Sequence, residues 1–261
     1  MTTRVHTDLE AYRVAVSELP VSATPARDLP AAVAVVRGEG RWWERASAAV
    51  RAGAGGIVVA QPGAAPSAEL HALARVAART PVVVERRLLR PGMRDLVDAS
   101  AAGHPPWHAV VVECHAPASA LRDVLPDAIG WARVVAGTPL TCRISQTWEG
   151  GTLALLDPAE GGAISLTATV QPGAPAHGRL RVTAIGQERV EVDADLDTVV
   201  SIADAAGRRI LPPLLESPER VALRRAIAAV RTGEVPLDLD ELRHDTALAE
   251  ELLTASIHKH R

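Results

Sequence analysis

The sequence is poor in aromatic residues, cysteine and lysine. Phe is absent and aromatic residues make up only 2% of the 261 positions, so an apolar core has to be built from Ala, Val, Leu and Ile. The two cysteines, Cys114 and Cys142, make neither a disulfide framework nor a metal-ligand spacing, and no metal is expected. Lys259 is the only lysine and stands near the end of the sequence, so no lysine within the fold is available for acid–base or Schiff-base chemistry.

Charge and hydropathy exclude further classes of protein. A net charge of −3 lacks the clustered basic excess of a nucleic-acid surface. No apolar run approaches the roughly 20 residues that span a bilayer. The opening residues MTTRVHTDLE contain no signal-peptide core. We therefore expect a cytoplasmic globular protein without nucleic-acid or membrane partners.

Apolar runs and helical patterns alternate along the first hundred residues. Ala31–Val36 and Gly56–Ala60 are apolar throughout, which is typical of strands buried on both faces. Each is followed by a helical pattern, and a further strand is predicted at Pro81–Val84. A short strand is also predicted at Tyr12–Ser17. Strands and helices in alternation predict an α/β portion with a parallel sheet, an incomplete Rossmann-like domain over residues 1–103.

The pattern changes from residue 104 onward. After a strand at 108–114 and a helix at Ser119–Ala136, short segments alternate apolar and polar residues, as in RLRVTAI (179–185). Such alternation predicts an antiparallel sheet with one buried face. Two closing helices follow, from Pro218 and from Asp238 to about Ile257. The expected second domain is an α+β sheet domain over 104–261, and its final helices can pack back on the first portion.

Four segments in order resemble the Gfo/Idh/MocA oxidoreductases: GIVVAQP (56–62), PVVVERRLLRP (81–91), ALRDVLPDAIGWARVVAG (120–137) and RRAIAAVRTGEVPLDLDELRHDTALAEELLTA (224–255). The resemblance implies a Rossmann-like domain followed by an α+β sheet domain. It also implies a homodimer, or a heteromer with a paralogue, formed through the open face of the antiparallel sheet.

The sequence departs from this family at the nucleotide-binding loop. The family's opening strand, G-x-G-x-x-G loop and helix have no counterpart, and about 50–60 residues of that unit are expected to be missing or collapsed into Tyr12–Pro30. The nearest substitute is Gly38-Glu39-Gly40, where Trp43 takes the third glycine position and Glu39 would repel a pyrophosphate. We interpret it as an ordinary βα turn, and no cofactor is expected.

The family's catalytic positions are also changed. Gln61 stands where the resemblance places a lysine, and an amide does not exchange protons near neutral pH. Asp127 stands where it places the catalytic histidine, while Asp123 is retained. Hydride transfer needs a proton shuttle with a pKa near the working pH. A nicotinamide-dependent dehydrogenase is therefore not expected.

The remaining candidates gather near predicted strand ends and on one helix. Asp123 and Asp127, four residues apart, would share a helix face and could bind a cation or act as acid and base, although Asp123 is better explained as a helix-start carboxylate. Arginines after Pro81–Val84 can hold a carboxylate or phosphate, or form a solvated edge. The candidates for catalysis are Asp127, Asp123 and Gln61, and those for ligand binding are Gln61, Arg86, Arg87, Arg90, His108 and Asp127.

Three functions stay open at this stage. One is a degenerate family member that serves as a ligand-binding or partner-binding module in small-molecule metabolism. Another is a cofactor-independent lyase, isomerase or cyclase of a biosynthetic pathway. The third is an oxidoreductase with an atypical nucleotide seat at Gly38–Gly40.

Overall fold

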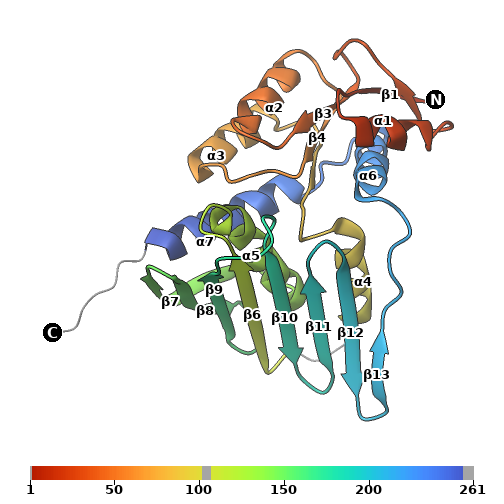
Figure 1. Ribbon diagram of the computed structural model, residues 1–261. Helices are drawn as coiled ribbons and strands as arrows, with labels where there is room; N and C mark the ends of the chain where they lie inside the picture. Colours follow the sequence, from red (N-terminus) through yellow and green to blue (C-terminus); the bar gives the residue numbers. More distant parts are fainter. Residues whose placement is uncertain (1, 102–106, 255–261) are drawn as a thin grey trace. The chain divides into compact units, whose positions relative to one another are not determined.

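The computed structural model describes residues 2–101 and 107–254 (Figure 1). The expected boundary at 103 and 104 and the expected helix end at Ile257 lie outside these residues. The chain divides into two compact units. Unit 1 comprises Met1–Arg87 and Leu214–Arg243, and unit 2 comprises Leu88–Pro213 and His244–Arg261.

Unit 1 is built on a parallel five-stranded sheet in the order β2-β1-β3-β4-β5. Its strands are β1 (Thr3–His6), β2 (Ala23–Pro25), β3 (Val33–Arg37), β4 (Gly56–Ala60) and β5 (Val82–Glu85). Its helices are α1 (Glu10–Ser17), α2 (Trp42–Arg51), α3 (Ser67–Val76) and α6 (Pro218–Thr232), and α7 (Asp238–Thr254) begins in it. The predicted parallel α/β portion is confirmed.

Both faces of this sheet are covered, which explains the unbroken apolar strands. In β4, Ile57 and Val59 pack with residues of α2 and α3, whereas Val58 packs with residues of α1 and α6 on the opposite face. Every residue of β4 is buried. Helix α6 starts with Ser217 as its N-cap, as the Ser-Pro pair indicates, because the Ser217 hydroxyl accepts a hydrogen bond from the Arg220 N–H at 3.3 Å.

The opening of the chain differs from the prediction. Tyr12–Ser17 belongs to helix α1 and is not a strand; Tyr12, Ala15 and Val16 are its buried residues, which is the spacing of a helix face. A short strand, β1, precedes it and β2 follows it. The opening βαβ unit is therefore present in a short form. A stretch as short as YRVAVS is compatible with either a strand or a helix, because it spans fewer than two helical turns.

Unit 2 contains an eight-stranded sheet in the order β13-β12-β11-β10-β6-β9-β8-β7. Its strands are β6 (Ala109–Ala116), β7 (Leu140–Trp148), β8 (Gly151–Pro158), β9 (Ile164–Val170), β10 (Arg179–Ile185), β11 (Arg189–Ala194), β12 (Thr198–Asp204) and β13 (Gly207–Ile210). Its helices are α4 (Pro91–Ala101) and α5 (Leu121–Ala136), and it includes α7 from His244. The sheet is mixed and mostly antiparallel, since β6 and β9 run parallel.

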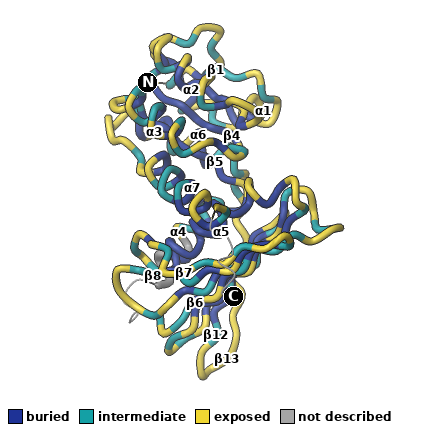
Figure 2. Tube along the Cα trace, turned by 90° about the vertical axis from the view of Figure 1, so that its left-hand side faces the viewer, coloured by how far each residue is buried: buried dark blue, intermediate teal, exposed yellow. Residues whose placement is uncertain are grey.

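Helix α5 covers one face of this sheet. Its residues Leu125 and Ile129 are fully buried among inward residues of β6, β9 and β10, and Gly137 ends the helix in the left-handed conformation with φ 70°. The other face points outward, so that residues of β6 alternate between buried and more exposed positions. All residues of the edge strand β13 are exposed (Figure 2).

Candidate functional site

The carboxyl edge of the parallel sheet in unit 1 brings Gln61 and Arg87 together. Gln61 follows β4 with a φ of 50°, which is uncommon for a residue with a side chain. Its N–H donates to the Glu85 carbonyl oxygen at 2.8 Å. Its side-chain oxygen Oε1 accepts hydrogen bonds from Nε and Nη2 of the exposed Arg87, at 3.2 and 2.9 Å. The strained backbone of Gln61 thus presents an amide that holds a guanidinium.

Two neighbours of Arg87 are buried at this edge. Glu85, at the end of β5, is only 1% exposed and accepts a hydrogen bond from the Tyr12 hydroxyl at 2.9 Å. Burial and then the charge of Glu85 raise the pKa of Tyr12 far above its ordinary value, so the hydroxyl remains a donor. Arg86 is 5% exposed. Of the two adjacent arginines, Arg87 is therefore the one that reaches solvent.

The loop between β1 and α1 stands where a doubly wound sheet receives a dinucleotide, because the strand order reverses between β1 and β3. This loop contains Thr7, Asp8 and Leu9 and no glycine. The Leu9 N–H donates to the Thr7 hydroxyl oxygen at 3.1 Å, and Glu10 lies in the first turn of α1. The loop and the first turn of α1 thus carry one carboxylate each, and the Leu9 N–H already has an acceptor.

The loop between β3 and α2 contains Gly38. The Gly38 N–H donates to the Ala60 carbonyl oxygen at 2.8 Å, and its carbonyl accepts from Gly63 at 2.8 Å. A Cβ at Gly38 would lie 2.4 Å from the carbonyl oxygens of both Ala60 and Gln61. Close approach of two backbone segments therefore explains this glycine without a ligand.

Asp127 and Trp131 lie one turn apart on α5 and bind the same residue. The Asp127 Oδ2 accepts the Leu88 N–H at 2.9 Å, and the Trp131 Nε1–H donates to the Leu88 carbonyl oxygen at 2.7 Å. Asp127 is buried, whereas Asp123 in the first turn of the helix is exposed. The two carboxylates share a helix but not an environment, and Asp127 positions the backbone of Leu88.

The last two candidates lie on other parts of unit 2. Arg90, before α4, donates to the Leu196 carbonyl oxygen and lies 4.0 Å from the Asp197 carboxylate. The exposed His108 precedes β6, and its backbone N–H donates to the Ile185 carbonyl oxygen at 2.8 Å. The structure thus pairs Gln61 with Arg87, and it places Arg90, His108 and Asp127 on three different elements.

A buried charge cluster in unit 2 is absent from the sequence-based candidates. Arg133 on α5 donates through Nε and Nη2 to the two carboxylate oxygens of the fully buried Asp245 on α7, at 3.0 and 3.2 Å. His244 lies 3.2 Å from Asp245 Oδ1 through Nδ1 and 3.0 Å from the Leu140 carbonyl oxygen through Nε2. The hydrogen bond to Asp245 raises the pKa of His244. Arg133 and Asp245 stand among other charged residues of α5 and α7, so no local pattern in the sequence marks them.

Within residues 2–101 and 107–254, no group of three or more His, Cys, Asp or Glu side chains is placed to hold a metal ion. Over the same stretches, no helix has the length and hydropathy to span a membrane. Cys114 and Cys142 are both free thiols, and burial raises the pKa of Cys114 to about 12, which leaves it protonated near neutral pH.

Comparison with known proteins gives structural matches only. No family model and no curated protein sequence matches the chain. The 3-ketoreductase KijD10 from Actinomadura kijaniata in complex with NADP is similar in structure, with a TM-score of 0.70, 17% identity and a match over 98% of each chain. The UDP-N-acetylglucosamine 3-dehydrogenase GnnA from Acidithiobacillus ferrooxidans matches with a TM-score of 0.72 and 14% identity over 97% of this chain and 96% of its own. At these identities the chain shares their fold, and the predicted fold class is confirmed.

Proposed function

We propose that this chain is a divergent relative of the Gfo/Idh/MocA oxidoreductases that binds a small anionic ligand without NAD(P). The loop between β1 and α1 carries this proposal. A dinucleotide pyrophosphate needs close approach to the backbone and unused N–H groups at a helix N-terminus. Thr7, Asp8 and Leu9 provide no glycine, the Leu9 N–H is bound within the loop, and Asp8 and Glu10 would repel the phosphates. These residues do not fit the cofactor.

The number of strands supports the same proposal. The six-stranded doubly wound sheet has the order 3-2-1-4-5-6. The parallel sheet of unit 1, as far as the chain is described, has the order β2-β1-β3-β4-β5, which corresponds to that pattern without its outer strand. A shortened nucleotide-binding half of the sheet supports the proposal that this chain does not bind the dinucleotide.

The ligand chemistry follows from Arg87. A guanidinium has five N–H donors in a planar fork that suits a carboxylate or phosphate. Gln61 accepts from Nε and Nη2 and so fixes the orientation of the group, while Arg87 stays exposed. A neutral amide partner leaves the positive charge of Arg87 uncompensated at that contact. This favours an anionic ligand at the carboxyl edge of the sheet.

A cofactor-independent lyase, isomerase or cyclase is the second candidate. The burial of Asp127 on α5 is the observation that favours it. The hydrogen bond from the Leu88 N–H gives the same carboxyl group a structural role instead. An oxidoreductase with its nucleotide at Gly38–Gly40 has less support, since the Gly38 N–H is bound to Ala60.

Titration calorimetry tests the leading proposal. We expect no heat of binding with NADH or NADPH, and saturable binding of a phosphate-bearing probe such as UDP-N-acetylglucosamine or inorganic phosphate. Arg87→Gln should weaken that binding about tenfold or more. Arg79→Gln is the matched control, because Arg79 is also exposed but precedes β5, at the amino edge of the sheet. Micromolar binding of either dinucleotide would contradict the proposal.

We propose in addition that the outward face of the sheet in unit 2 mediates self-association or association with a paralogue. Exposed apolar side chains are interspersed on this face with ion pairs such as Arg181–Asp193 at 2.7 Å. The apolar residues concerned are Val111, Leu153, Ile185 and Val199. Light scattering on the purified protein should give the mass of a dimer, and Val199→Asp should shift it toward the monomer.

A further inference from the structure

A polar pocket of about 430 Å³ opens in the outward face of unit 2. Strand β6 contributes Glu113 and His115, and strand β10 contributes Arg179 and Arg181. In the antiparallel register Arg179 lies opposite His115, and Arg181 lies opposite Glu113. Facing residues on such strands hold their Cβ atoms about 5 Å apart. One wall of the pocket therefore carries an acid and an imidazole, and the other carries two guanidinium groups.

The rim of the pocket is a fixed loop between β9 and β10. The Gln171 N–H donates to the Ala116 carbonyl oxygen at 2.9 Å, which ties the start of the loop to β6. At its end, His177 Nε2 lies 2.5 Å from Asp195 Oδ1. Gln171, Gly173, Ala174 and Pro175 line the cavity. A loop held at both ends gives the pocket a preformed wall, which lowers the entropic cost of binding.

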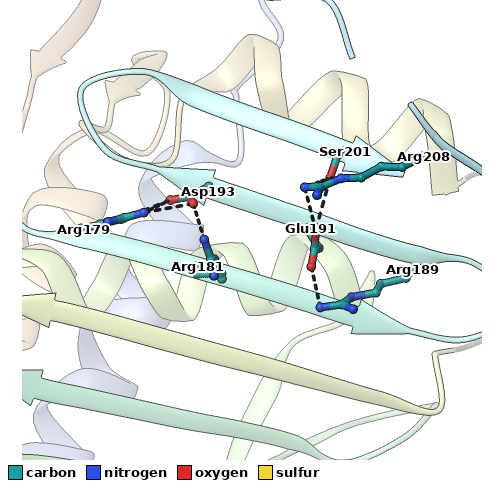
Figure 3. A network of polar contacts seen from close by, with 7 residues as sticks. All are labelled: Arg179, Arg181, Arg189, Glu191, Asp193, Ser201 and Arg208. Carbon is teal, nitrogen blue, oxygen red and sulfur yellow. Dashed lines mark hydrogen bonds and ion pairs between the residues drawn. The ribbon is translucent and has the colours of Figure 1, made fainter. Parts of the chain in front are cut away.

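Asp193 orients the two arginines from the neighbouring strand β11. Its Oδ2 accepts from Arg181 Nη2 at 2.7 Å, while its contacts with Arg179 are longer, between 3.2 and 3.3 Å (Figure 3). Each guanidinium has more donors than these contacts use. The arginines are thus preoriented and still able to bind an acceptor.

Glu113 is unlike the other acids of this face. Glu191 is paired with Arg189 and with Arg208, at 2.5 and 2.9 Å (Figure 3). Among the described residues, neither the Glu113 carboxylate nor the His115 imidazole makes a hydrogen bond or ion pair. The pocket therefore offers an unpaired anionic acceptor beside two oriented cationic donors.

We propose that this pocket binds a small zwitterion of the amino-acid class, with its carboxylate on Arg179 and Arg181 and its ammonium group on Glu113. A simple anion fits less well, because Glu113 and Asp193 offset the charges of the two arginines. A simple cation fits less well because of the arginines themselves. The cavity lies within the range of about 300–1,000 Å³ for small-molecule sites. The proposal concerns unit 2 and is independent of the Arg87 edge in unit 1.

Three matched probes test it by two-dimensional ¹H–¹⁵N NMR on the full chain: L-glutamine, its N-acetyl derivative and its methyl ester. L-Glutamine should shift the amide signals of 113–116 and 171–181 in a saturable way. The derivatives, which lack the ammonium or the carboxylate charge, should each bind roughly tenfold more weakly. No saturable shift with L-glutamine, or equal affinity for the N-acetyl derivative, would overturn the proposal.

Substitutions test which pocket residue binds the ammonium group of the ligand and which binds its carboxylate. Glu113→Gln should remove the preference for L-glutamine over its N-acetyl derivative. Arg179→Gln should remove the preference for L-glutamine over its methyl ester. Arg189→Gln is the control, because Arg189 lies on the same face and is paired with Glu191 but does not line the pocket. If Arg189→Gln loses as much affinity for L-glutamine as Arg179→Gln does, the assignment of the carboxylate to Arg179 is overturned. The particle mass of each variant, measured by light scattering, separates an effect on association from one on binding.

Discussion

The two units of this protein use their sheets in different ways. Strand β4 of unit 1 is buried at every residue, since helices cover both faces of its parallel sheet, and polar side chains reach solvent at the strand ends. Strand β6 of unit 2 alternates, because helix α5 covers one face and the other points outward. Candidate binding groups accordingly lie at an edge in unit 1, where Gln61 holds Arg87, and on a face in unit 2, around Glu113 and Arg181.

Contacts of different kinds hold the two units together. Loops at the carboxyl edge of unit 1 are joined by backbone hydrogen bonds such as that from the Gly38 N–H. An ion pair between helices occurs in unit 1, where the side chain of Arg225 is 31% exposed and that of Asp238 is 8% exposed. A more deeply buried one, Arg133 with Asp245, occurs in unit 2. A fixed backbone tolerates no added atoms, whereas a buried ion pair tolerates no loss of one charge. Substitutions at each kind of contact test this difference between the two units.

The largest effect is expected at Asp245. Asp245→Asn removes the carboxylate that Nε and Nη2 of Arg133 bind, and breaking a buried ion pair typically costs about 3–5 kcal/mol of the free energy of unfolding. Urea denaturation measures it. Asp157→Asn is the control, because its partner Arg143 is 59% exposed, and the loss there should stay below about 1 kcal/mol. Equal losses in the two variants would show that the buried pair does not distinguish unit 2.

A smaller effect is expected at Gly38. In Gly38→Ala the new Cβ would meet two carbonyl oxygens at 2.4 Å, and backbone atoms cannot turn aside as a side chain can. We expect a loss of about 3 kcal/mol. Gly40→Ala serves as the control, because its φ of 54° is unfavourable for Ala but its Cβ meets no atom within 4 Å; its cost should be about 1 kcal/mol. If Gly38→Ala has the same free energy of unfolding as the parent, the close approach of Gly38 to the carbonyl oxygens of Ala60 and Gln61 does not restrict this position.

The smallest effect is the pH dependence at His244. Its pKa is raised by the hydrogen bond to Asp245, so its contribution to stability is fully present below the unfolded pKa of about 6.5 and is lost as the pH rises through the folded value. The stability difference between the parent and His244→Gln should therefore be larger near pH 6 than near pH 8.5, by less than about 1 kcal/mol. An imidazole pKa below 6.5 in an NMR titration would contradict this.

Most helices and strands could be predicted from the sequence, and the reason is their periodicity. The predicted bounds of β4 and β10 agree with the structure, since an unbroken apolar run and a strict alternation each allow one simple explanation. Tyr12–Ser17 was wrong because eight residues of helix present too few turns to show their period. Strand β13 was missed because all its residues are exposed and carry no burial pattern.

The candidate sites were less predictable because contacts between distant residues decide them. The family resemblance marked Gln61 and Asp127, and residue type marked Arg87, but only the fold pairs Gln61 with Arg87 and ties Asp127 to Leu88. Nothing in the order of residues sets Glu113 beside Arg181, which lies far away in the sequence; the register of β6 with β10 does so.

The order of apolar and polar residues is enough to predict two sheets, one covered on both faces and one on a single face, because hydrophobic period follows directly from burial. It also fixes which residue types can occupy each loop, such as Thr7, Asp8 and Leu9 between β1 and α1. Which charges are buried, paired or exposed depends on the folded chain. Those properties depend on neighbours that the chain brings together over long separations, where no local pattern records them.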